Sequence, residues 1–404
     1  MIYLIIIIAF LVLSYYYDYR NHTNGRYFWW MIMLIILICV AGFRYRMGGD
    51  SIRYENSYDE LPTLSTLKNR DFLNTRYAPL YIILCAACRS ITRDFVLLQF
   101  VVAIFVNIAF FRFIYKNTPK IFIAGFLYFL FLYLMLNMQV LREAIAVSFF
   151  LLGWKAFVRN KWLIYYGYVM LAFLFHVSAV LLFILPLIKL PWLKSLFIFG
   201  KRSWIIIPLI LVTSFGIKYF LFDFVQAIAL TETMSERAQT YSEDDLGGST
   251  KNIFGIIGWL FRSCTYPLIS LYYLKKQGAE NDPHFRNIEI MCMLSVYVGE
   301  MCVGVSILSR YLNYFMVFQF LVMSYFIYSR SFNFLRFKIK LRYFGWIGLL
   351  MPLIGIVFYI DYCASLTRSG KLKAYDMYYP YSNQIEKNIS PNRKRVINYS
   401  RKIR

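Results

Sequence analysis

Three positions place a charged or titratable side chain inside or beside strongly apolar stretches of the chain. Arg142 lies in the run 141–146, His176 interrupts a long apolar segment, and Arg310 stands between two apolar runs. Insertion scales put the cost of an arginine at the centre of a membrane helix at roughly 2.5–3.5 kcal/mol. Such a residue is therefore usually kept for a buried partner, for an anionic ligand, or for a place near the aqueous interface.

A fourth unusual region, residues 44–58, mixes cations, acids, glycines and tyrosines between apolar segments. Arg44, Arg46 and Asp50 surround the Gly48-Gly49 pair, and Tyr54 follows. One interpretation is a binding loop. The alternative is an interfacial loop in which the arginines pair with nearby acids, and in which the glycines only provide a turn with positive φ.

Simple alternatives also exist for the three isolated positions. Arg142 could be neutralised by Glu143 or by a neighbouring helix, although adjacent residues on a helix do not face each other. His176 could be a hydrogen-bonded packing residue, and Arg310 could be an interface anchor. Tyr311 and Tyr314 fit aromatic residues at the membrane interface as well as ligand-binding ones.

The composition identifies the class of protein that must position these residues. The chain has 404 residues, of which 60% are hydrophobic, 20% aromatic and only 16% charged, which is outside the range of soluble domains. The formal net charge of +23 fits basic cytoplasmic loops, and nucleic acid is not implied. Six of the seven cysteines fall in apolar stretches, so neither a disulfide framework nor a metal site is expected. The sequence therefore predicts an all-α polytopic membrane protein.

With about 20 residues per crossing as the measure, the sequence predicts about ten full transmembrane helices. They are Met1–Tyr17 (a retained first helix, not a removed signal), Tyr27–Phe43, Phe95–Tyr115, Ile121–Met138, Leu141–Phe157, Trp204–Phe224, Ile253–Leu274, Ile288–Leu308, Tyr311–Tyr328 and Tyr343–Ile360. Residues 1–360 would form the helical bundle and residues 361–404 a basic tail. No soluble domain is large enough to act alone, so chemistry is expected at the membrane face.

Two further apolar segments do not fit a single crossing. Basic clusters flank residues 162–188 on both sides, and basic loops are typically cytoplasmic, so this segment is predicted to be a hairpin or broken helix with His176 near its tip, toward the outer face. Residues 77–89 are short and follow Pro79, which favours a re-entrant half-helix. Loops 44–76 and 227–251 are then expected outside. The same reasoning puts the tail outside despite its basic character.

The order of motifs resembles a known family. The run Phe43–Tyr54 is similar to the Arg-Tyr, Gly-x-Asp, Tyr signature that follows the second helix in EpsG and Wzy-type polysaccharide polymerases. Further matches are the runs Leu141–Ala146, His176–Ala179, Ser309–Tyr314 and Tyr379–Tyr381. Arg46 departs from the pattern, because a small or neutral residue is expected there. Which of Arg44 and Arg46 acts is therefore left open.

The resemblance implies a multi-pass glycosyltransferase of the bacterial inner (plasma) membrane. Such an enzyme joins oligosaccharide repeat units carried on undecaprenyl pyrophosphate, and it extends an exopolysaccharide, capsule or O-antigen chain at the outer face. The bilayer, a flippase and a chain-length regulator are the implied partners. No cofactor and no metal are expected.

The resemblance also implies roles for the residues. Planar guanidinium groups can bind pyrophosphate oxygens bidentately without a metal, and a carboxylate or imidazole can take the proton of an attacking sugar hydroxyl. The catalytic candidates are His176, Asp50 and Arg142. The candidates for substrate binding are Arg44, Arg46, Tyr54, Arg310, Tyr311 and Tyr314.

Three other functions remain open at this stage. Another glycosyltransferase acting on lipid-linked sugars would share the substrate chemistry, but Asp59-Glu60 is a poor match to the acidic pair usual in an early outer loop of such enzymes. A membrane acyltransferase could use His176 with an arginine. A polysaccharide transporter or flippase often shows two pseudo-repeated halves, and no internal repeat is visible in this sequence.

Overall fold

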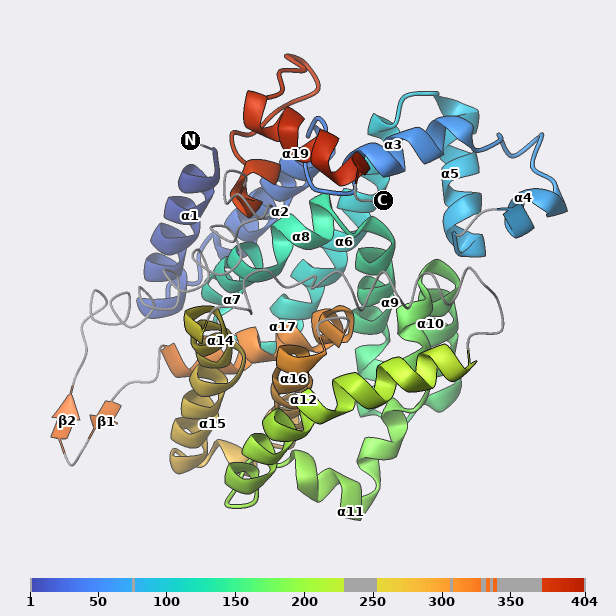
Figure 1. The fold of residues 1–404 in the computed structure, drawn as a ribbon. Helices are drawn as coiled ribbons and strands as arrows, with labels where there is room; N and C mark the ends of the chain where they lie inside the picture. The colour runs from blue at the N-terminus through green and yellow to red at the C-terminus, as the bar shows by residue number, and fades with distance from the viewer. Residues whose placement is uncertain are drawn as a thin grey trace. The chain divides into compact units, whose positions relative to one another are not determined.

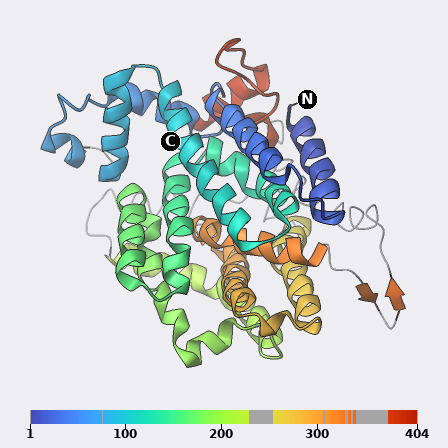
Figure 2. The ribbon, with the colours of Figure 1, turned by 180° about the vertical axis from the view of Figure 1, so that it is seen from behind.

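The computed structural model describes residues 2–74, 77–228, 253–305, 308–327, 332–334, 337–339 and 373–402. The chain divides into two compact units. The first comprises Met1–Leu187, Tyr328–Tyr343 and Ala374–Arg404, and the second comprises Ile188–Ile327 and Phe344–Lys373. Both are helical (Figures 1 and 2), which confirms the all-α class. Strands β1 (Phe332–Phe334) and β2 (Phe337–Ile339) form one short antiparallel pair, with Phe332 opposite Ile339.

The first unit contains most of the motifs noted in the sequence. Its helices are α1 (Ile2–Leu13), η1 (Ser14–Tyr19), α2 (Arg26–Gly42), α3 (Ser51–Glu60), α4 (Asn69–Asn74), α5 (Pro79–Ile91), α6 (Val96–Asn117), α7 (Ile121–Tyr128), η2 (Phe129–Tyr133), α8 (Leu134–Met138), α9 (Leu141–Val158), α10 (Trp162–Phe175), η3 (Val177–Phe183), η10 (Ala374–Met377) and α19 (Pro391–Lys402), with η4 (Leu185–Lys189) at its boundary. Here η1 and η2 are π-helical, whereas η3, η4 and η10 are 3₁₀ helices.

Several of these helices can cross a membrane, so the chain is a membrane protein. In the described part of the chain, four helices are long and apolar enough, and a fifth is obtained if a pair bent by 100° counts as one span. The four are Ile2–Tyr19, Val96–Asn117, Ile121–Met138 and Pro283–Gly304, and the bent pair is Val177–Lys189 with Pro191–Phe197. The expected count of about ten crossings is therefore not confirmed. Some apolar segments form helices of only 10–17 residues, and the segment expected at 343–360 lies outside the described residues.

A buried polar network holds the middle of the first unit together. The amide nitrogen of Asn107 on α6 donates to Asn137 on α8 at 2.7 Å, and the Tyr128 hydroxyl donates to Asn107 at 3.1 Å. Buried polar groups are costly unless they are hydrogen-bonded. These bonds therefore fix α6 against the α7–α8 segment. That segment ends at Met138, four residues before Arg142.

Asp18 fastens one end of the unit. Its carboxylate accepts a hydrogen bond from the Ile123 main-chain nitrogen at 2.8 Å and lies 3.4 Å from Arg26, while Lys120 donates to the Asp18 carbonyl. The start of α1, by contrast, lies at the other end. There the Tyr3 hydroxyl donates to the carbonyl of Tyr378 in the C-terminal segment. Both views show this segment beside α2, at the end of the unit where the N-terminus lies (Figures 1 and 2).

The two segments that did not fit a simple crossing are irregular in the structure. Helix α10 ends at Phe175, His176 is extended (φ −155°, ψ 127°), and η3 returns along α10. In the return, the Tyr165 hydroxyl donates to the Leu182 carbonyl at 2.8 Å. Thus the predicted break at His176 is present.

Helix α5 has 13 residues, fewer than a crossing needs. Both of its ends contact α3. The Tyr77 and Ser57 hydroxyls are 2.5 Å apart, and the Tyr58 hydroxyl donates to the Thr92 carbonyl at 2.8 Å. Helix α5 is therefore held against α3 at both ends, and its re-entrant path through the membrane stays a prediction.

The second unit is a separate bundle. It contains α11 (Pro191–Lys194), η5 (Ser195–Phe197), α12 (Ser203–Ile228), α14 (Ile253–Leu260), η6 (Phe261–Thr265), α15 (Tyr266–Lys276), η7 (Ala279–Asn281), α16 (Pro283–Gly304) and α17 (Ser309–Ile327). A buried ion pair joins α15 to α16, with Lys275 Nζ 3.0 Å from Glu289 Oε1, which also accepts from the Phe199 main-chain nitrogen. The acidic loop around residues 231–251 lies outside the described residues.

Candidate active site

Arg142 is the second residue of α9, and its guanidinium lies among three tyrosine rings. Its Cζ atom is 4.6 Å from the centroid of the Tyr77 ring and 5.9 Å from the centroids of Tyr54 and Tyr81. Arg142 also hydrogen-bonds with the Tyr54 hydroxyl. A cation over an aromatic face gains about 0.5–2 kcal/mol, with the larger values at desolvated sites. We call Arg142 with Tyr54, Tyr77 and Tyr81 the arginine cage.

The arginine cage has positive charge without an acidic partner. Within the described residues no carboxylate forms an ion pair with Arg142, and its Nε is buried without a hydrogen-bond partner. The neighbouring Glu143 is itself buried, but consecutive helix residues do not face each other. The N-terminus of α9, where Arg142 lies, adds partial positive charge from the helix dipole. The arrangement is therefore suited to an anion.

A break between α8 and α9 sets the position of Arg142. Helix α8 ends at Met138, and Val140 leaves helical geometry (φ −112°, ψ 59°). Gly48 packs directly on this break. It has φ +89°, and a Cβ built on it would collide with the Met138 carbonyl oxygen. The close approach explains why glycine occupies this position, beyond its role in a turn.

The C-terminal segment closes over the same loop. The Tyr45 main-chain nitrogen donates to the Ser382 carbonyl at 2.9 Å, and the Gln384 main-chain nitrogen donates to the Phe43 carbonyl at 2.9 Å. Arg44 and Asn383 form an antiparallel bridge. Residues 374–402 are therefore packed against the motif that follows α2 and belong to the first unit.

The two arginines of the loop have different environments. Arg44 is 1% exposed and donates to the Ala41 carbonyl, and burial lowers the pKa of its guanidinium to about 10, so it stays protonated at neutral pH. Arg46 pairs bidentately with Glu55, with Nε–Oε2 at 2.8 Å and Nη2–Oε1 at 3.2 Å. This pairing raises the pKa of Arg46. Arg44 thus holds the main chain through its hydrogen bond to the Ala41 carbonyl. The guanidinium of Arg46 is already bonded to the Glu55 carboxylate.

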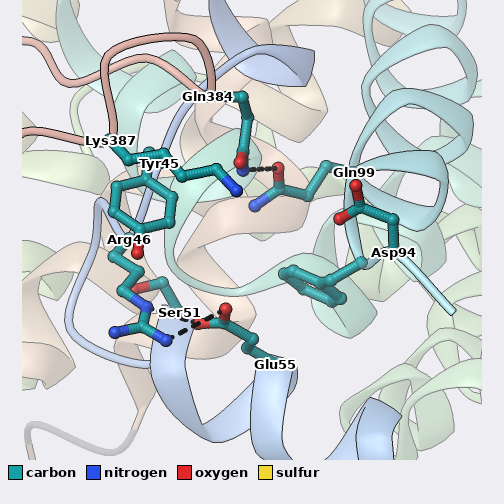
Figure 3. A pocket seen from close by; sticks show the side chains of 9 residues that line it. Tyr45, Arg46, Ser51, Glu55, Asp94, Gln99, Gln384 and Lys387 are labelled. Carbon is teal, nitrogen blue, oxygen red and sulfur yellow. Dashed lines mark hydrogen bonds and ion pairs between the residues drawn. The ribbon is translucent and has the colours of Figure 1, made fainter.

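A polar pocket of about 220 Å³ lies against a neighbouring face of α3 (Figure 3). It is lined by Tyr45, Arg46, Ser51, Glu55, Asp94, Phe95, Gln99, Gln384 and Lys387. Asp50 occupies the N-cap position of α3, with its carboxylate 4.0 Å from Arg53. One short helix therefore carries Tyr54 of the cage, Glu55 of the pocket and Asp50 at its start. Among the described residues, no three His, Cys, Asp or Glu side chains are close enough to hold a metal ion.

The match to a known family covers the arginine cage and most of the residues that line the pocket. The EpsG family profile matches residues 27–383, nearly the full chain. The chain belongs to the EpsG family. The family indicates a function of the polysaccharide-polymerase type. The chain matches no curated protein and no solved structure.

In this EpsG-family chain, His176 lies at the break after α10. Its Nδ1 accepts a hydrogen bond from the Ser178 main-chain nitrogen at 3.3 Å and is 2.5 Å from the Ser178 hydroxyl. Phe175 stacks on Phe149 of the antiparallel helix α9, with ring centroids 5.6 Å apart. Phe149 is seven residues after Arg142, so this contact lies roughly 10 Å along the axis of α9 from Arg142.

The remaining sequence candidates of this EpsG-family chain belong to the second unit. Arg310 is exposed in the first turn of α17. Tyr311 is half-buried, and Tyr314 is 1% exposed and packs beside Phe315. The second unit also contains a buried cation that sequence reasoning missed. Arg262 is 6% exposed in η6, with its guanidinium 4.5 Å from the Trp259 ring.

Other residues of the cage and of the pocket were also missed from the sequence. Tyr77 and Tyr81 stand at the start of α5, and Gln384 comes from the C-terminal segment. The signal for the tail was present, because Tyr379-Pro380-Tyr381 was one of the motifs shared with the family. The Tyr381 hydroxyl donates to the Val40 carbonyl at 3.0 Å, which ties that motif to the end of α2.

Proposed function

We propose that this EpsG-family protein is a glycosyltransferase that polymerises undecaprenyl-pyrophosphate-linked oligosaccharide repeat units into a surface polysaccharide, at the outer face of a bacterial plasma membrane. The observation that carries the proposal is the arginine cage. It offers a cation, an unpartnered Nε–H and a helix N-terminus, and no acidic group in the described residues neutralises Arg142. A pyrophosphate is the anion that a lipid-linked sugar donor carries.

The proposed reaction makes one bond and breaks one. A sugar hydroxyl of the acceptor attacks the anomeric carbon of the donor, the bond from that carbon to the pyrophosphate oxygen breaks, and the bonding electrons leave with the lipid pyrophosphate. Arg142 stabilises the negative charge that develops there. The hydroxyl proton passes to a base, and Asp50 and His176 are the candidates.

The charges at the ends of two helices support the proposed sidedness. Helix α9 begins at the cage and α6 begins beside the pocket, so the opposite ends of both helices lie away from the site. Those opposite ends carry Arg112, Lys116, Lys155 and Arg159. Basic residues at helix ends favour the cytoplasmic side. The cage and pocket are accordingly proposed to face outward.

Further parts of the proposal concern the second unit and the partners. Arg310 is proposed to contact a second phosphate or the saccharide, with Tyr311 and Tyr314 beside it. A flippase would deliver the lipid-linked repeat unit to the outer face, and a chain-length regulator would act on the product.

Arg142→Lys tests the proposal. Lysine keeps the charge but lacks the planar fork, so charge-assisted hydrogen bonds of about 1.5–3 kcal/mol each would be lost. We expect polymer to fall at least about tenfold, while unpolymerised lipid-linked repeat units accumulate and the protein level is unchanged. Gel electrophoresis of surface polysaccharide and mass spectrometry of the lipid fraction measure both.

Arg112→Lys is the matched control, because Arg112 is exposed on α6 near the far end. It should leave polymer length unchanged. Polymer of normal amount and length in the Arg142→Lys strain would refute the role of the cage as the pyrophosphate site.

A further inference from the structure

The polar pocket beside α3 has a ligand chemistry different from that of the arginine cage. Its lining carries two cations, Arg46 and Lys387, and two acids, Glu55 and Asp94, so the formal charges balance. A pyrophosphate would gain little from such a lining. An apolar lipid chain would leave buried polar groups unpaired. The lining instead suits a neutral ligand with many hydroxyl groups.

The polar groups converge on the pocket from three parts of the chain. Lys387 of the C-terminal segment and Asp94 before α6 point toward Gln99 from opposite sides, and Arg46 with Glu55 closes the lower edge (Figure 3). Gln384 Nε2 donates to the Arg44 carbonyl at 2.9 Å and lies 3.4 Å from the Gln99 amide. These bonds hold the amides in place, which limits the entropy lost when a ligand binds.

We propose that this pocket binds one sugar ring of the saccharide at a distance from the reacting pyrophosphate, and so contributes to the choice of repeat unit. A volume of about 220 Å³ is large enough for one pyranose ring. Sugar hydroxyls both donate and accept hydrogen bonds. The Asp94 carboxylate can accept from them, the Lys387 ammonium can donate to them, and Tyr45 offers an aromatic face.

The position of the pocket relates it to the proposed reaction. Ser51 and Glu55 face the pocket, and Tyr54 of the arginine cage is on the adjacent face of the same helix, α3. A repeat unit with its pyrophosphate at Arg142 could therefore place a non-reacting ring in the pocket. The inference rests on the proposed function for the identity of the ligand, but the sugar binding itself can be measured without catalysis.

The experiment uses the full chain in lipid nanodiscs and an oligosaccharide released by mild acid from the host's own surface polysaccharide. This probe lacks pyrophosphate. Saturation-transfer NMR should detect its binding to the wild type. Asp94→Asn combined with Lys387→Gln should weaken binding by about tenfold or more, because both charge-assisted contacts are removed. Both side chains are at the exposed rim, so the variant should fold.

Two controls separate this inference from the proposed function. Asp59→Asn removes an exposed acid of α3 outside the pocket and should leave binding unchanged. Arg142→Lys should also bind the oligosaccharide normally, because the probe has no phosphate. Equal binding by wild type and the Asp94→Asn, Lys387→Gln variant would overturn the inference, whatever the polymerisation assay shows. Weakened binding in that variant together with full polymerisation by Arg142→Lys would support the sugar pocket and refute only the cage.

Discussion

At the scale of single residues, three arginines of the first unit show how environment separates side chains of one type. Arg44 is buried and donates to the Ala41 carbonyl, Arg46 is held by Glu55, and Arg142 is surrounded by tyrosines. The sequence could locate all three as unusual. It could not predict which partner each arginine has. The partner of Arg46 is nine residues away, and the rings around Arg142 come from α3 and from the start of α5.

The hydrogen bonds of His176 affect its proposed role. A ring nitrogen that accepts from a main-chain N–H carries no proton, so in the neutral ring the proton is on the other nitrogen. Nδ1 accepts from Ser178, so Nε2 is the donor in this state. His176 is then arranged to cap η3 and to donate a hydrogen bond, and Asp50 becomes the stronger candidate for the base.

Two substitutions at His176 distinguish capping from base catalysis. Asparagine is a good N-cap residue, whereas alanine cannot accept a hydrogen bond. If His176 acts by capping, His176→Asn should keep most of the polymerisation rate and His176→Ala should lose it. If it acts as the base, both should lose about 10²–10⁴-fold. The measurement is the rate with purified lipid-linked repeat units, alongside Asp50→Asn, which we expect to be slowed by that larger factor.

At the scale of elements, the contact between the Gly48 loop and the α8–α9 break makes a specific prediction. Gly48→Ala adds a Cβ that collides with the Met138 carbonyl at a residue with φ +89°, so the loop or the break must move. Strain of about 1–3 kcal/mol is expected. The melting temperature in detergent should fall, and polymerisation should fall with it because Arg142 follows the break.

Gly49→Ala is the matched control for this prediction. Its added Cβ would be 3.4 Å from the Met377 sulfur, an ordinary contact, and Gly49 has no positive φ. It should change the melting temperature little. An equal loss of stability at both glycines would contradict the argument from the close approach.

The elements also show what periodicity and charge could predict. Basic clusters on both sides of residues 162–188 correctly predicted a break, and its position at His176 agrees with the structure. Hydropathy was less informative about helix length. Helix α2 has 17 residues, because it ends just before the sharply turning loop that holds Arg44, and that loop is defined by contacts with the C-terminal segment.

At the scale of the whole molecule, the membrane topology can be tested with single cysteines in a chain whose seven native cysteines are replaced. Ile385 is 87% exposed beside the pocket, and Arg159 is exposed at the far end of α9, so we choose Ile385→Cys and Arg159→Cys. A membrane-impermeant maleimide should label the first in intact spheroplasts and the second only after lysis. The reverse pattern would place the site on the cytoplasmic side.

The sequence did not predict that the C-terminal segment packs against the loop that follows α2. The hydrogen bond from Gln384 to the Arg44 carbonyl joins residues 340 positions apart, and no local pattern encodes such a pairing. The tail was therefore expected to be a separate basic segment, 361–404. In the structure, the part within residues 374–402 supplies side chains to the pocket and main-chain hydrogen bonds to the loop.

This long-range pairing has a consequence for biosynthesis. The loop at residues 43–50 leaves the ribosome early, but the segment that completes it is made more than 300 residues later, after the intervening helices have been inserted. The pocket therefore cannot exist during most of translation. A chain interrupted by premature termination before residue 374 would carry the cage motif without a closed site, so an aborted product could occupy the membrane without being able to select a saccharide.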